Sequence, residues 1–191
     1  MRSPLRSLAC GAAAALLAAG CGPSHPRVDL ETPFGVVRVE LYEDRAPRTV
    51  ASFLRHVDEG RFDSASFYRV RRDQGQLMRR PTGVVQGGLW AGDDTARLAP
   101  VPFESTRATG LKHTEGMVSM ARFGDVNSAR AEFFVVLGDQ PHLDWRGPDS
   151  PGYAVFGKVV EGMEVVRAIG GLPARGELLR RPVPFRASRT E

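Results

Sequence analysis

The sequence predicts a mainly β protein, a β-barrel with two helical caps, and two observations lead to that prediction. Short strand-like runs bounded by turn residues recur at 67–71, 83–87, 117–121, 133–137 and 153–160. Two other stretches carry the apolar period of a helix. Many short strands with few helices favour a barrel, although periodicity alone establishes only that the fold is mainly β.

The first two predicted strands form a hairpin. Residues 28–31 and 37–41 alternate apolar and polar side chains, as half-buried strands do. The segment 32–35 between them reads Thr-Pro-Phe-Gly, which is typical of a turn. The two strands are therefore expected to be antiparallel neighbours.

The two predicted helices each have one apolar face. Pro47 suits the first turn of a helix and Gly60 is placed to end it. Between them, apolar residues recur at the spacing of one helix face, at Val50, Phe53, Leu54 and Val57. The second helix is expected over 162–169, with an apolar face made by Met163, Val166 and Ile169.

The N-terminal residues predict an export signal. Arg2 and Arg6 precede an apolar stretch at 8–19, as in a secretory signal peptide. Small residues then lead to Cys21, and this arrangement resembles the cleavage box of bacterial lipoproteins. The alternatives are an ordinary signal peptide with a chance cysteine and a membrane-spanning anchor, for which the apolar stretch is too short.

The lipoprotein interpretation divides the chain into four parts. Residues 1–20 are a lipoprotein signal peptide, and 21–27 form a tether that acyl chains on Cys21 fix to a membrane. Residues 28–186 are the globular domain, and 187–191 are a C-terminal tail. The expected location is the bacterial envelope, facing the periplasm, and Gly22 favours the outer membrane.

The charge and the position of the cysteines restrict which partners and disulfides are expected. The chain has 191 residues and a formal net charge of +4, and all but two of its 26 basic residues are arginines. Acidic residues are interspersed and no basic stripe carries interleaved aromatics, so nucleic acid is not an expected partner. Both cysteines, Cys10 and Cys21, precede the globular part, which therefore has no internal disulfide. The protein is expected to be a monomer.

Several motifs together suggest the chemistry. Arg69 follows two aromatic residues, Gln86 precedes two glycines, and a double phenylalanine ends at Phe134. Together with Ala121-Arg122 and His142-Leu143, these motifs resemble the cyclophilin-type peptidyl-prolyl cis-trans isomerases. The resemblance covers roughly residues 28 to 186. It implies an eight-stranded antiparallel barrel capped by two α-helices, proline-containing polypeptides as partners, and no cofactor or metal.

The resemblance also assigns the site residues. Arg69 matches the catalytic arginine of the family. The substrate-binding positions are Phe67, Val84, Gln86, Ala121, Arg122, Glu132, Phe134, His142, Leu143 and Tyr153. Within this set, Phe134, Leu143 and Tyr153 match the proline pocket, and Phe133 is expected to point the opposite way, into the core. Seen in isolation, Arg69 also fits a surface ion pair, and the pocket residues also fit ordinary core packing.

An arginine suits the rotation of an X-Pro bond. The barrier to rotation is about 18–20 kcal/mol because amide resonance must break. In the twisted state the prolyl nitrogen gains a lone pair, so a fixed cationic donor stabilises that state more than the planar one. Arginine stays charged and its planar fork holds direction. One charge-assisted hydrogen bond contributes about 1.5–3 kcal/mol, and the remainder must come from an apolar pocket that grips the proline ring.

The chain departs from the family pattern at the pocket wall. Gly83 and Val84 stand where the family has Phe-Met, and an insertion near 71–82 separates Arg69 from Gln86. Leu77 or Met78 in the insertion could replace that wall. His142 is interpreted as a polar rim residue rather than as a base or metal ligand, since no second ligand has suitable spacing.

Three functions remain open at this point. The first is a membrane-tethered prolyl isomerase that assists protein folding. The second is a binding module or chaperone that keeps a proline groove with little turnover. The third is a structural envelope lipoprotein on a reused fold, since fold does not dictate function.

Overall fold

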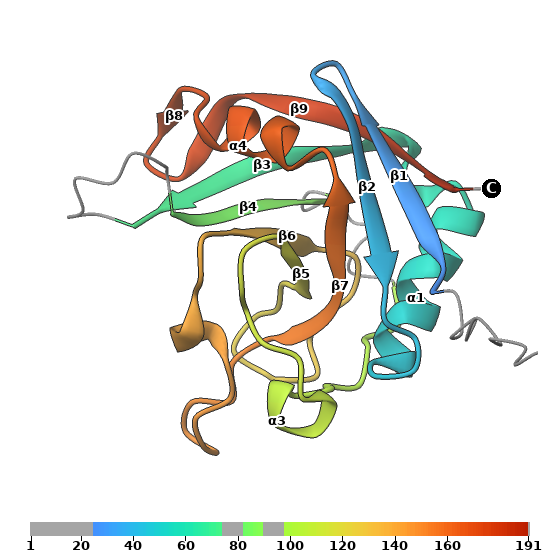
Figure 1. Ribbon diagram of the computed structural model, residues 1–191, viewed down its shortest axis with the longest axis vertical. Coiled ribbons are helices and arrows are strands. Elements are labelled where there is room, and N and C mark those ends of the chain that lie inside the picture. The colour runs from blue at the N-terminus through green and yellow to red at the C-terminus, as the bar shows by residue number, and fades with distance from the viewer. Residues whose placement is uncertain (1–24, 74–81, 90–97, 191) are drawn as a thin grey trace, which may run out of the picture.

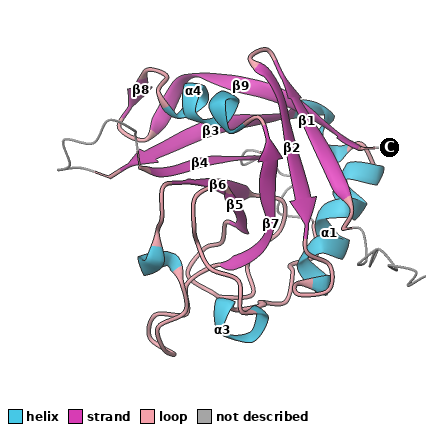
Figure 2. Cartoon of the chain, in the orientation of Figure 1, coloured by secondary structure: helices cyan, strands magenta, loops and turns pink. Residues whose placement is uncertain are grey.

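The computed structural model describes residues 25–73, 82–89 and 98–190 (Figures 1 and 2). The strands are β1 Arg27–Thr32, β2 Gly35–Leu41, β3 Ala65–Arg72, β4 Gly83–Gly88, β5 Met117–Met120, β6 Phe133–Leu137, β7 Ala154–Glu161, β8 Ala174–Arg175 and β9 Leu178–Arg189. The helices are α1 Pro47–Asp58, α3 Thr106–Thr109 and α4 Met163–Gly170, with short 3-10 turns at Arg61–Ser64 and Pro141–Leu143.

Eight of the strands close into an antiparallel barrel. Their order is β1-β2-β7-β5-β6-β4-β3-β9, and β1 pairs with β9 to complete the ring. The two-residue β8 is attached to β9 alone. The eight-stranded barrel expected from the sequence is confirmed. So are the predicted hairpin of β1 with β2 and the two predicted helices, α1 and α4.

Aromatic side chains fill the barrel interior. Phe62, Phe67 and Phe185 are fully or almost fully buried, and the ring centroids of Phe67 and Phe185 lie 4.9 Å apart. Phe53 reaches in from α1 and meets Phe133 edge to face at 5.6 Å. Aromatic pairs in such geometry add about 0.5–1.5 kcal/mol beyond their buried area. The cluster therefore ties α1 to the barrel wall.

The start of α1 is capped from a distant loop. Ala46, the residue before the helix, offers no side-chain cap. Glu104 replaces it, because its carboxylate accepts hydrogen bonds from the backbone N–H groups of Arg48 and Thr49 at 3.2 and 2.9 Å. An anion at a helix N-terminus also interacts favourably with the helix dipole. This cap fixes α1 against the loop that follows residue 98.

The last strand corrects the expected C-terminal boundary. β9 runs to Arg189, and its residues 186–189 pair with β1. The predicted tail at 187–191 therefore contributes three residues to the barrel closure. Pro182 and Pro184 obscured this strand in the sequence, because proline removes a donor from the ladder. Both prolines are exposed, whereas alternate residues such as Val183 face the interior.

A second apolar cluster lies on the outer side of the barrel wall. It is formed by Met117, Phe134, Val136, Leu143 and Val155. Phe133 belongs to the interior core and Phe134 to the outer cluster, as the alternation of a strand requires. The predicted opposite orientation of these two phenylalanines is confirmed. The outer cluster forms the floor of the candidate site.

Within the described ranges, the helices are too short or too polar to cross a membrane. The predicted signal peptide and Cys21 lie outside the described residues, and so do Leu77 and Met78.

Candidate active site

A β-bulge in β3 sets the direction of Arg69. Phe67 pairs with Gly87 of β4 and Arg69 pairs with the next residue, Gln86, so Tyr68 is one extra residue on β3 at this point. The pairing of β3 with β9 is also irregular between Phe67 and Arg69. In a regular strand Phe67 and Arg69 would share a face. The bulge breaks that alternation. Phe67 and Val70 are buried in the core, and Arg69 lines the outer cleft beside Tyr68.

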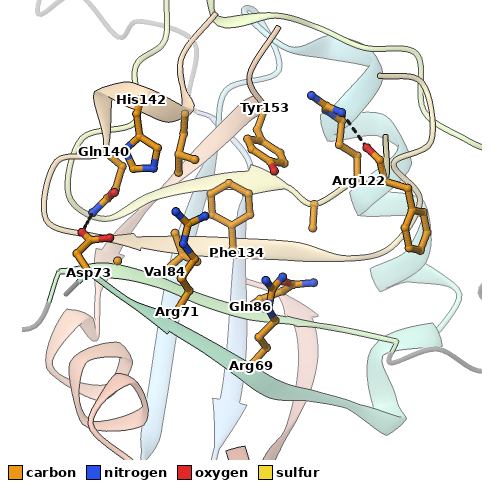
Figure 3. Close-up of a pocket in the computed structure, with 14 residues that line it drawn as sticks. Arg69, Arg71, Asp73, Val84, Gln86, Arg122, Phe134, Gln140, His142 and Tyr153 are labelled. Atoms are coloured by element: carbon orange, nitrogen blue, oxygen red, sulfur yellow. Dashed lines mark hydrogen bonds between the residues drawn. The ribbon is translucent and has the colours of Figure 1, made fainter. Parts of the chain in front are cut away.

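The register then places three site residues in a row. Arg69 pairs with Gln86 of β4, and Gln86 pairs with Phe134 of β6. Directly paired residues in a sheet project from the same face. A cation, an amide and an aromatic ring therefore lie side by side on one surface of the barrel, where Figure 3 shows Arg69 and Gln86 next to Phe134.

Hydrogen bonds join Arg69 to a buried polar chain. Arg69 Nη1 donates to Gln86 Oε1 at 2.8 Å, and Gln86 Nε2 donates to the Tyr68 hydroxyl at 2.7 Å. The Tyr68 hydroxyl in turn donates to Glu132 Oε2. Each bond fixes the next, so the chain determines which way the Gln86 amide faces. On its other side, Arg69 donates from Nε and Nη2 to Glu177 Oε2, and the Nε bond measures 2.8 Å.

The glycines of β4 are required by close approach of the neighbouring strands. A Cβ on Gly87 would lie 2.7 Å from the Phe67 ring, and one on Gly88 would lie 2.5 Å from the Ala131 carbonyl oxygen. At Gly83 the φ angle is +132°, and a Cβ would lie 1.9 Å from the carbonyl oxygen of Arg71. The aromatic wall absent at position 83 is thus incompatible with this backbone.

The cleft has a volume of about 210 Å³ and is lined by residues of β3, β4 and β6 and of the loops next to them. Its lining residues are Arg69, Arg71, Asp73, Gly83, Val84, Gln86, Ala121, Arg122, Phe123, Phe134, Gln140, His142, Leu143 and Tyr153 (Figure 3). The structure therefore brings together Arg69 and eight of the ten other predicted site residues. Phe67 and Glu132 are the two that it leaves out.

Phe67 does not line the cleft, although the sequence predicted it as a substrate-binding residue. Its exposed fraction is 0%, because it precedes the bulge and faces the barrel interior with Ala65, whereas the bulge turns Arg69 outward. Glu132 lies behind the cleft, where it accepts the hydrogen bond from Tyr68. Glu132 is connected to the cleft by the hydrogen bonds of Tyr68 and Gln86.

The apolar floor of the cleft is held in place by aromatic contacts. Phe134 meets Tyr153 edge to face at 5.4 Å and stacks on the His113 ring at 6.0 Å. Leu143 is buried in the same cluster. A rigid apolar surface flanked by a few polar groups is the usual form of a small-ligand pocket. This floor suits a proline ring.

Arg122 builds one end of the cleft. Its guanidinium donates to the carbonyl oxygen of Gly152 from Nε and Nη2, and from Nη1 to the carbonyl oxygens of Phe123 and Gly124. It also lies over the Tyr153 ring at 5.0 Å. These bonds use backbone carbonyls, so Arg122 joins two loops and keeps its positive charge at the rim.

The opposite end of the cleft contains residues that the motifs did not single out. Gln140 Nε2 donates to Asp73 Oδ2 at 2.7 Å, and this bond connects the segment after β3 with the turn before His142 (Figure 3). Arg71 lines the cleft beside Val84, its partner in the register. The polar, arginine-rich character of the insertion was the only sequence signal for Arg71 and Asp73.

A serine, a histidine and an aspartate also lie together beneath the floor. His113 Nδ1 is 2.8 Å from Asp144 Oδ1, and His113 Nε2 is 3.0 Å from Ser119 Oγ. This order resembles a nucleophilic triad. Ser119 is 0% exposed, however, so its hydroxyl has no access to a substrate in the cleft. The group instead satisfies buried polar atoms under Phe134.

Burial shifts three pKa values around the site. Burial raises the pKa of Glu132 to about 7, and the bonds from Tyr68 and from the Leu89 backbone oppose the shift. Burial and the adjacent Glu132 raise the pKa of Tyr68. Burial lowers the pKa of His113, against the opposing effect of Asp144. Tyr68 therefore stays a hydroxyl donor, and near neutral pH a substantial fraction of Glu132 is a neutral acid. Among the described residues, no cluster of ligating side chains could hold a metal ion.

Comparisons with known proteins agree with this geometry. The family model described as cyclophilin type peptidyl-prolyl cis-trans isomerase/CLD matches residues 27–186. The peptidyl-prolyl cis-trans isomerase cyp18 of Streptomyces antibioticus is 35% identical over 159 residues, which cover 82% of this chain and 90% of that protein. Peptidyl-prolyl cis-trans isomerase B of Escherichia coli K12 is 31% identical over 159 residues, covering 82% and 92%.

Solved structures show the same fold. A cyclophilin type peptidyl-prolyl cis-trans isomerase of Cryptosporidium parvum superimposes with a TM-score of 0.70 at 20% identity, covering 87% of this chain and 98% of that chain. A second structure of that protein, in the presence of the dipeptide Ala-Pro, gives a TM-score of 0.68. The barrel, the matching residues and the relatives together place this chain in the cyclophilin-type peptidyl-prolyl cis-trans isomerase family.

Proposed function

We propose that this protein catalyses rotation about X-Pro bonds of polypeptides in the bacterial envelope and so assists their folding. The observation that carries the proposal is the row formed by Arg69, Gln86 and Phe134 in one cleft. It sets a cation beside an apolar floor on which a proline ring can pack. The named relatives are isomerases of the same family, which supports the same activity here.

The cleft suggests how the reaction proceeds. The proline ring packs on Phe134, Leu143 and Tyr153, while the Arg69 guanidinium reaches the prolyl nitrogen. As the bond twists, the nitrogen lone pair develops and the donor strengthens its bond to it, which lowers the barrier. Gln86 holds the guanidinium by the 2.8 Å bond from Nη1. No group is transferred, so the mechanism needs neither a nucleophile nor a metal.

Peptide exchange measured by NMR tests the proposal. The domain from residue 25 onward should broaden and merge the cis and trans signals of an Ala-Pro peptide, because it accelerates their exchange. Saturable shifts of cleft resonances with no accelerated exchange would favour the chaperone alternative. Neither shifts nor exchange would favour a structural lipoprotein.

The envelope location rests on the N-terminal segment. Arg2, Arg6 and the apolar stretch before Cys21 support export and acylation. Mass spectrometry of the protein expressed in a bacterium should find an N-terminal diacylated Cys21, and Cys21→Ser should lose the acyl chains. Cleavage at another position without added lipid would refute the anchor. We also propose that the protein is a monomer and does not bind nucleic acid.

A further inference from the structure

We infer that Glu177 is a positioning residue for the catalytic guanidinium, and this inference rests on the proposed isomerase function. Glu177 follows Gly176 in the turn between β8 and β9, far from Arg69 in the sequence. Its Oε2 accepts hydrogen bonds from both Nε and Nη2 of Arg69. Glu177 is not among the residues that line the cleft, so it contacts the guanidinium from the side away from the cleft.

The turn that carries Glu177 is itself attached to β3. The Glu177 carbonyl oxygen accepts a hydrogen bond of 2.8 Å from the Val70 backbone N–H, the residue after Arg69. Gly176 has a φ of +61°, which suits the tight turn between β8 and β9. Arg69 also pairs with Leu178 across the strands. The carboxylate is therefore presented to Arg69 from a fixed backbone.

Some N–H donors of Arg69 bind neighbouring side chains, and the others remain for a substrate. Glu177 takes the Nε proton and one on Nη2, and Gln86 takes one on Nη1. An arginine has five donor protons in a planar fork. Among the described residues, two protons have no partner, one on each terminal nitrogen, and these are the donors left for the peptide. The two partners thus fix the plane of the fork and leave its outer protons available.

This ion pair is poorly suited to a purely stabilising role. The side chains of Arg69 and Glu177 are 40% and 45% exposed. Exposed pairs contribute little to folding because water screens them and ordering long side chains costs entropy. Holding a catalytic group in one orientation, in contrast, lowers the reorganisation needed in the transition state. The carboxylate also partly neutralises the positive charge of Arg69. The experiment must therefore separate the effect of Glu177 on the orientation of Arg69 from its effect on the charge.

Isomerisation kinetics of Glu177 variants test the inference. We expect Glu177→Ala to lower kcat about tenfold with KM changed less than about twofold, since one charge-assisted bond is of that size. Glu177→Gln keeps the length and one acceptor and should recover part of the loss. In NMR spectra, the Arg69 Nε–H signal should be protected from exchange in the wild type and lose protection in Glu177→Ala.

The outcomes separate the possible roles. Glu161→Ala is the matched control, since Glu161 pairs with Arg38 at 2.7 Å outside the cleft, and its kcat should not change. A higher kcat in both Glu177 variants would show that the carboxylate only weakens the positive charge of Arg69, which would contradict a positioning role. An unchanged kcat in Glu177→Ala with an active wild type would overturn the inference alone. An inactive wild type would instead refute the proposed function.

Discussion

Arg69 donates a hydrogen bond of 2.8 Å from Nη1 to Oε1 of Gln86, its direct partner across β3 and β4. The bond links the proposed catalytic cation to a chain that continues through Tyr68 to the buried Glu132. The bulge at Tyr68 makes this possible, because it turns Arg69 to the outer face. The catalytic geometry therefore depends on residues that the substrate does not touch.

Removing Gln86 should loosen the guanidinium. In Gln86→Ala, Arg69 loses one of the two side-chain partners that it has among the described residues, and Tyr68 loses the donor at 2.7 Å. We expect kcat/KM for X-Pro exchange to fall about tenfold, the effect of losing one charge-assisted bond. NMR exchange on an Ala-Pro peptide measures this, with near-ultraviolet circular dichroism as the control for folding. An unaltered kcat/KM would mean that Gln86 does not orient Arg69.

Glu132 should make stability depend on pH. Burial raises its folded pKa from the ordinary value of 4.5 to about 7, and its Oε1 has no hydrogen-bond partner within the described part of the chain. The folded state favours the protonated acid, so this stabilisation is complete below pH 4.5 and is lost as pH rises through about 7. Glu132→Gln keeps a neutral group at every pH.

The difference between wild type and Glu132→Gln isolates this effect from other titrating groups. The variant should gain stability relative to wild type between these two pH values, reaching about 3 kcal/mol at pH 8, since one pKa unit corresponds to about 1.4 kcal/mol. Urea unfolding at pH 5 and pH 8 measures it. Glu161→Gln, at an exposed position, should show no such trend. A constant difference across the range would contradict the raised pKa.

Gly83 should resist substitution. Its φ of +132° and the 1.9 Å between a built Cβ and the Arg71 carbonyl oxygen leave no room for a side chain. We expect Gly83→Ala to cost at least about 3 kcal/mol of unfolding free energy, from strain and strand displacement. Gly124→Ala is the matched control, because nothing lies within 4 Å of its Cβ. Equal urea midpoints for the two variants would show that β4 can move away.

Ser119 should not react as a nucleophile. It lies 3.0 Å from His113 Nε2, yet it is 0% exposed beneath the cleft floor. A fluorophosphonate probe that labels activated serines should leave the protein unmodified by mass spectrometry. Labelling at Ser119 that disappears in His113→Ala would show that the floor opens and that the triad is functional.

Alternation and turn composition predicted most of the barrel. The hairpin of β1 and β2 and the faces of α1 and α4 follow from apolar spacing. The strand β9 was missed because its two prolines mask an alternating pattern. Its continuation to Arg189 depends on pairing with β1, at the opposite end of the chain. Such long-range pairing leaves no local signal in the sequence.

The candidate site, like the barrel, was predicted from the sequence only in part. Motifs predicted the row of Arg69, Gln86 and Phe134, because strand register converts fixed spacing into proximity. Phe67 was misplaced because the bulge puts Phe67 and Arg69 on opposite faces of β3, although regular alternation would put them on the same face. Glu177 was missed because a turn brings it to Arg69 from the far end of the chain. These contacts are properties of the fold rather than of a motif.

The most direct test of the account compares wild type, Arg69→Ala and Arg69→Lys in the exchange of one Ala-Pro peptide. If a fixed guanidinium stabilises the twisted prolyl bond, kcat should fall at least about tenfold in Arg69→Ala. Arg69→Lys keeps the charge but lacks the fork that binds Gln86 and Glu177, so it should recover little. All three proteins should retain the same circular dichroism. Wild-type kcat in folded Arg69→Ala would contradict the central claim.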